Sequence, residues 1–97
     1  MMDFYIINDD KPRPKSITGL EFAGSLNELL FEDLQNENII ENHFDYYKDF
    51  RLTGNIVKIK LEIINSKQLN DNFAASKFKE ILEKAVKQSY GLLASCD

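Results

Sequence analysis

Residues that commonly build catalytic and metal sites are scarce in this chain of 97 residues. It has a single cysteine, Cys96, and a single histidine, His43, so it can form neither an intrachain disulfide nor a zinc site made of several such residues. Its four glycines do not form a Gly-x-Gly-x-x-Gly or Gly-x-x-x-x-Gly-Lys loop, which excludes the usual nucleotide-binding motifs. We therefore expect no cofactor and no enzymatic activity. A small hydrolase or nuclease that uses His43 with nearby acids is kept as the enzyme alternative.

Long apolar stretches are also missing from the chain. Runs such as Phe4–Ile7 are far shorter than the roughly 18 residues of a membrane-spanning helix. The first residues lack the basic start and the apolar stretch of a secretory signal. Hydrophobic residues make up 43% of the chain and charged residues 29%, which at this length is typical of one globular domain over residues 1–97. We expect a cytoplasmic protein that does not interact with a membrane.

Basic residues are absent from a third of the chain, because there is no lysine or arginine between Lys15 and Lys48. This stretch has a charge of −7, from Glu21, Glu28, Glu32, Asp33, Glu37, Glu41 and Asp45. The rest of the chain holds all 12 basic residues and nine acids, a net charge of +3. The overall charge of −4 argues against direct binding to nucleic acid. The acidic stretch is suited to steering a basic protein partner, although a solvated surface that keeps the protein soluble has the same composition.

Two short apolar segments predict strands at the two ends of the chain. Asp3–Ile7 is rich in aromatic and β-branched residues, and Asn8–Pro14 after it has the residues of a turn and an extended loop. Near the other end, Leu92–Cys96 is short and apolar enough to be a final strand. We expect these two strands to pair, which ties both ends of the chain into one sheet.

Helical spacing is clearest in two places. Ser25 and Glu28 have the spacing of a capping box and predict a helix up to about Leu34, with an apolar face made of Leu26, Leu29, Leu30 and Leu34. Asp33 falls within that face, so it either caps the next segment or meets a partner. A long amphipathic helix is predicted over 73–90, closed by Gly91 in the left-handed conformation.

Two other segments are less decisive. The spacing of apolar residues in 36–45 fits one face of a second short helix. In 56–64, apolar residues alternate with charged ones and predict a half-buried strand, while a helix stays the alternative because most of the apolar residues also share one helical arc. The predicted fold class is α+β, with a small antiparallel sheet that includes the N- and C-terminal strands and packs against three or four helices.

The densest cluster of aromatic and charged residues lies at 45–54, next to the acidic stretch. Tyrosine and arginine are enriched among the residues that dominate binding energy at interfaces. We expect Phe50 to point inward and Tyr46 or Tyr47 to point outward. The predicted partner-binding residues are Glu28, Glu32, Asp33, Glu37, Glu41, Asp45, Tyr46, Tyr47, Asp49 and Arg51.

Three segments together resemble a known family. Phe4–Asn8, Tyr46–Arg51 and Gly91–Asp97 look like the corresponding parts of small bacterial immunity proteins of contact-dependent growth inhibition and polymorphic-toxin systems. The resemblance implies a cytoplasmic antitoxin that binds one cognate toxin domain, often a nuclease, and covers or distorts its active site. The alternative is a small adaptor or a homo-oligomeric structural protein without a toxin partner. The sequence leaves the oligomeric state open.

Overall fold

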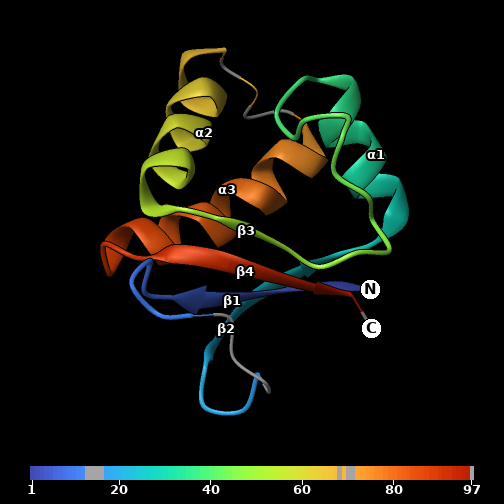
Figure 1. The fold of residues 1–97 in the computed structure, drawn as a ribbon. Helices are drawn as coiled ribbons and strands as arrows, with labels where there is room; N and C mark the ends of the chain where they lie inside the picture. The colour runs from blue at the N-terminus through green and yellow to red at the C-terminus, as the bar shows by residue number, and fades with distance from the viewer. Residues whose placement is uncertain (13–16, 68, 70–71, 97) are drawn as a thin grey trace.

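The computed structural model describes residues 1–12, 17–67, 69 and 72–96 of the chain. These residues form the elements β1 (Met2–Ile7), β2 (Glu21–Leu26), α1 (Glu28–Asn36), β3 (Phe50–Leu52), α2 (Gly54–Ser66), α3 (Phe73–Lys87) and β4 (Gly91–Cys96). The strands make one antiparallel sheet in the order β2-β1-β4-β3. All three helices of this part of the chain lie on one face of the sheet (Figure 1). The predicted α+β fold with an antiparallel sheet is confirmed.

The two strands at the chain ends form the centre of the sheet. Phe4 lies opposite Ala94 and Ile6 opposite Leu92. These side chains face the helices and are buried. The predicted pairing of the first and last strands is confirmed, and β1 and β4 lie side by side in Figure 1. The predicted loop after β1 begins with a turn in which Lys11 N–H donates to the Asn8 carbonyl, while its end at 13–14 lies outside the described residues.

Helix α3 lies across the sheet between the other two helices (Figure 1). It starts where the Asn72 side chain accepts a hydrogen bond from Ala75 N–H at 3.0 Å, which caps the helix. Its apolar face is buried, and the ring of Phe78 lies 5.8 Å from that of Phe4 in β1. The predicted helix in this region is confirmed, although it ends at Lys87.

The prediction that a helix begins at Ser25 is wrong. Residues 21–26 form β2, which pairs with β1, and the cap of α1 is Asn27, whose side chain accepts from Leu30 N–H at 2.9 Å. This later start changes the inward face of the helix to Phe31 and Leu34, with Leu30 packed at its edge. Leu29, which was predicted to be inside, is 71% exposed.

Asp33 also lies elsewhere than predicted. It is an exposed residue within α1, outside the apolar face, and it does not cap the next segment. The second short helix predicted over 36–45 is also wrong, because in the structure α1 ends at Asn36 and turns follow. The backbone N–H groups of Ile39 and Ile40 both donate to the Leu34 carbonyl, so the chain reverses here and buries both isoleucines.

Residues 56–64 belong to α2, so the predicted strand is wrong and the helical alternative is right. The misleading residue is Lys60, which is 4% exposed and shares the inward face with Val57 and Ile64. Ile56 and Ile59 lie outside and are partly exposed. A buried lysine beside exposed isoleucines imitates the alternation of a strand. The cap of α2 comes from a distant residue, since both carboxylate oxygens of Asp9 accept from Gly54 N–H at 3.0 Å.

Gly91 does not close α3 in the left-handed conformation as predicted. Ser89 has that conformation, with φ 59°, and Gly91 is the first residue of β4. Gly91 is needed there for another reason. A Cβ at this position would overlap the backbone carbonyl of Leu52 and lie 2.6 Å from Asp9 Oδ1, so the close approach of β4 to β3 excludes a side chain.

These two positions predict opposite effects of substitution. Gly91→Ala should lower the free energy of unfolding by about 2 kcal/mol, because backbone atoms must move to make room for a methyl group. Ser89→Gly should raise it by about 0.5 kcal/mol, because glycine adopts positive φ without steric cost. Urea denaturation of both variants measures these changes. A destabilised Ser89→Gly together with an unaffected Gly91→Ala would contradict the arrangement described here.

Candidate partner-binding site

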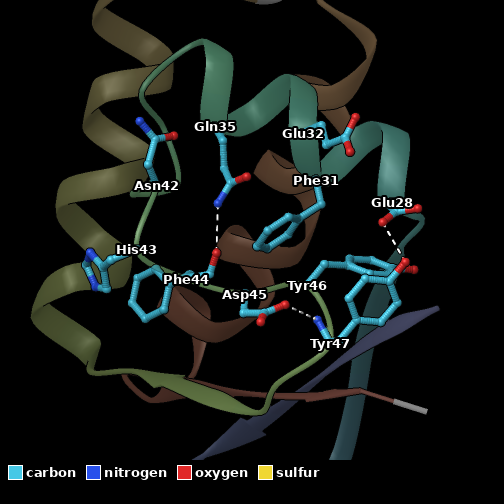
Figure 2. Close-up of a pocket in the computed structure, with 10 residues that line it drawn as sticks. All are labelled: Glu28, Phe31, Glu32, Gln35, Asn42, His43, Phe44, Asp45, Tyr46 and Tyr47. Carbon is cyan, nitrogen blue, oxygen red and sulfur yellow. Dashed lines mark hydrogen bonds between the residues drawn. The ribbon is translucent and has the colours of Figure 1, made fainter.

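A surface hollow of about 350 Å³ lies between α1 and the segment 42–47 that leads to β3 (Figure 2). We call it the acidic hollow. The residues that line it are Glu28, Phe31, Glu32, Gln35, Asn42, His43, Phe44, Asp45, Tyr46 and Tyr47. Half of the ten residues predicted from the sequence are among them, namely Glu28, Glu32, Asp45, Tyr46 and Tyr47. The folded chain therefore brings two separate parts of the acidic stretch to one place.

The α1 side of the acidic hollow follows from helical periodicity. Glu28, Glu32 and Gln35 are spaced by four and three residues, so they lie along one face of α1 once the helix starts after Asn27. Glu28 is the first residue of this row. Its carboxylate accepts a hydrogen bond from the Tyr47 hydroxyl at 2.6 Å (Figure 2). Two chain segments 19 residues apart are joined at this point.

The opposite side of the acidic hollow has neither helix nor strand, and α1 holds it in place. The Gln35 amide donates to the carbonyl oxygens of Glu41, at 3.1 Å, and Phe44, at 2.9 Å. The Phe44 ring stacks on Phe50 of β3 with centroids 4.3 Å apart, and Phe31 of α1 meets the Tyr46 ring at 5.6 Å. These contacts give an irregular segment a defined shape.

The two tyrosines of this segment differ in exposure. Tyr46 packs against the core, and its hydroxyl donates to the Leu26 carbonyl at 3.4 Å. Tyr47 is 65% exposed, and its ring meets that of Tyr46 edge to face at 5.2 Å. Phe50 packs against the hydrophobic core. The prediction that Phe50 points inward and one tyrosine outward is confirmed, with Tyr47 as the outward one.

The chemistry of the acidic hollow favours a positively charged group. Glu28, Glu32 and Asp45 line it, and the described lining residues include neither lysine nor arginine. The rings of Phe31, Phe44 and the tyrosines form the remaining walls (Figure 2). Carboxylates bind ammonium and guanidinium groups through charge-assisted hydrogen bonds, and aromatic faces attract the same groups. The hollow is suited to a lysine or arginine side chain of another protein.

Two predicted acids, Asp33 and Glu37, lie on another part of the surface. Leu29, Asp33 and Glu37 follow one another at intervals of four residues. Leu29 and Asp33 lie on an exposed face of α1 and Glu37 lies at its C-terminal end, and none of the three lines the acidic hollow. Asp49 and Arg51 contact the chain itself. Asp49 accepts from Cys96 N–H at 2.8 Å, and Arg51 donates to the carbonyl oxygens of Lys11, at 2.7 Å, and Asn8, at 3.1 Å.

Glu41 is also used internally. Its carboxylate pairs with the buried ammonium of Lys60 from α2. Asp49 also lines a neighbouring hollow of about 370 Å³, which shares His43, Phe44 and Asp45 with the acidic hollow. Asp45 thus lies between two surface depressions.

Sequence reasoning missed Phe31, Gln35, Asn42, His43 and Phe44 as residues of the partner-binding site. Gln35 is the one that the sequence offers a signal for. It follows Glu28 by seven residues and Glu32 by three, which is the spacing of one helical face. The predicted helix ends at about Leu34, one residue before Gln35, whereas α1 continues to Asn36.

The described residues also show where other kinds of site are missing. In this part of the chain, no group of three or more His, Cys, Asp and Glu side chains is placed to hold a metal ion. Within the same residues, no helix is long and apolar enough to cross a membrane. His43 is exposed at the acidic hollow, and its ring centroid lies 4.3 Å from that of Phe44.

Tyr47 reports directly on the charge of the acidic hollow. Its pKa is raised above the ordinary value, first because the hydroxyl donates a hydrogen bond to Glu28 and then because of lost hydration and the negative charge of Glu28. Glu28→Gln should therefore lower the pKa of Tyr47, because it removes the negative charge and because the new amide can donate a hydrogen bond to the phenolate. An NMR titration of the Tyr47 ring at alkaline pH measures this change.

Glu62→Gln is the matched control, because Glu62 is an exposed acid on α2. It should leave the pKa of Tyr47 unchanged. Equal titration of Tyr47 in the two variants and the unsubstituted protein would show that Glu28 does not control this side of the hollow.

No family model, curated protein or solved structure matches this chain.

Proposed function

We propose that this chain is an immunity protein that binds a cognate toxin domain, a basic nuclease, and neutralises it by covering its active site with the surface around the acidic hollow. The observation that carries the proposal is that Glu28 and Glu32 of α1 line the same hollow as Asp45 of a different segment, together with aromatic rings. Nucleases hold the phosphates of their substrates with lysine and arginine, so their active sites present cations that such a hollow can bind. Acidic side chains then occupy the place of the phosphates.

The electrostatic part of this proposal concerns mainly the speed and selectivity of binding. Complementary charges accelerate the encounter of two proteins and penalise wrong partners, while exposed charge pairs add little to affinity. Tyr47 is the best placed residue to supply affinity, because it is an exposed aromatic side chain held in position by Glu28. The carboxylates and the tyrosine have different tasks in this account.

The size of a stable interface requires more than the hollow. A standard interface buries roughly 800 Å² on each partner, about a seventh of the 5839 Å² surface of this chain. The contact therefore extends from the acidic hollow over its surroundings. The neighbouring hollow at Lys48 and Asp49 is adjacent and shares lining residues, so it is the natural continuation.

A homo-oligomeric or adaptor protein is the second candidate, and one observation favours it. Ile59 is 50% exposed and Ile56 lies one turn before it on α2, so the helix presents apolar surface to solvent. Self-association through this stripe would bury it. Light scattering distinguishes the two candidates, because an immunity protein with a free acidic hollow does not require a homo-oligomer.

Charge reversal at the acidic hollow tests the proposed function. Glu32→Lys should slow association with the toxin domain encoded beside the gene by about tenfold at low salt, with a smaller effect at high salt because ions screen the added charge. Surface plasmon resonance at two salt concentrations measures the association rate. Glu62→Lys on α2 is the control, since it makes the same change in net charge at an exposed position of another element.

If both variants slow association equally, the acids act only through net charge and the acidic hollow is not the binding site. If the neighbouring gene encodes neither a toxin nor a toxin-fused surface protein, the proposed function itself fails.

A further inference from the structure

Lys60 is the one charged side chain that the described part of the chain buries, and the binding site described above does not include it. It projects inward from α2 between Val57 and Ile64, which belong to the hydrophobic core. A lysine in such a place needs a reason. Removing an ammonium group from water costs several kcal/mol unless strong partners replace the water, and an apolar side chain would fill the same space without that cost.

The partners of Lys60 all belong to the segment that leads into the acidic hollow. Its ammonium group donates to the Ile39 carbonyl at 2.7 Å and pairs with the carboxylate of Glu41. Glu41 directly precedes Asn42, the first residue of the segment that lines the hollow. The ammonium thus binds a backbone carbonyl and a carboxylate in a part of the chain that has neither helix nor strand.

Glu41 is bound by residues of two helices. Lys60 of α2 binds its side chain, while the Gln35 amide of α1 donates to its backbone carbonyl and to that of Phe44. Figure 2 shows Gln35 reaching down from α1 to Phe44, with Asn42 and His43 in the chain just before it. Side chains of both α1 and α2 therefore hold this wall of the acidic hollow in place.

We propose that Lys60 is a positioning residue that holds the segment 41–47 in the shape required to bind a partner at the acidic hollow; the binding part of this inference rests on the proposed function. Lys60 touches no partner itself, since it is buried. It acts by keeping an irregular segment ordered before binding, so that a partner does not have to order it. An apolar residue at position 60 would fill the same space but could bind neither the Ile39 carbonyl nor the Glu41 carboxylate.

The first test needs only the free protein. Lys60→Met removes the ammonium and keeps an apolar side chain of similar length. The amides of Phe44, Tyr47 and Lys48, which bond within the segment, should then exchange with solvent at least tenfold faster, while the amides of β1, β4 and α3 are unchanged. Hydrogen exchange measured by NMR gives each of these rates.

Lys84→Met is the matched control. Lys84 is an exposed lysine whose ammonium also donates to a backbone carbonyl, that of Ala23 at 3.1 Å, but it lies on α3 outside the segment. It should leave exchange in 41–47 unchanged. Glu41→Gln serves as the milder variant if Lys60→Met does not fold, because it removes only the charge of the half-exposed partner and should accelerate the same amides to a smaller degree.

The second test uses the toxin domain encoded beside the gene. Lys60→Met should slow association severalfold with the same salt dependence as the unsubstituted protein, whereas Glu32→Lys changes the salt dependence. Unchanged exchange in 41–47 would overturn the positioning role and leave the proposed function standing. Faster exchange with unchanged association would overturn the link between the segment and binding. If the unsubstituted protein forms no complex, the proposed function fails, and the exchange rates alone then decide whether Lys60 orders the segment.

Discussion

The aromatic contacts of Phe50 join the sheet to the candidate site, and much of the structure depends on them. Its ring stacks on Phe44 at 4.3 Å, meets Phe4 of the central strand at 6.3 Å and lies 6.4 Å from Phe31 of α1. Each such pair contributes about 0.5–1.5 kcal/mol beyond the burial of its area. The wall of the acidic hollow is therefore an extension of the hydrophobic core, which explains how a segment without helix or strand keeps a defined shape.

The seven acids of the acidic stretch do not gather at one place once the chain is folded. Glu41 is bound to Lys60, and outside the stretch Asp9 caps α2 and Asp49 binds the backbone of β4, so these acids stabilise the fold. Glu28, Glu32 and Asp45 remain at the surface and line one hollow. A run of charge in the sequence thus overstates the number of acids that line one site.

Local patterns were sufficient for the parts of the fold that are stabilised locally. The short apolar segments of β1 and β4 and the long apolar face of α3 were recognised, because each pattern is complete within its own segment. β2 and β3 are strands because of the neighbours they pair with, which no local pattern contains. Lys60 concealed α2, since the partners that make its burial tolerable lie about 20 residues earlier. The acids and tyrosines of the site were found by composition, whereas Gln35 lay one residue beyond the predicted end of the helix at Leu34.

The central claim is that a partner binds at the acidic hollow, and the most direct measurement is a comparison of hydrogen exchange in the chain alone and in complex with the proposed toxin domain. The account predicts that protection is concentrated in residues 28–35 and 42–47, with little change in α2. Protection confined to α2 around Ile56 and Ile59, with the acidic hollow still exchanging freely, would contradict it.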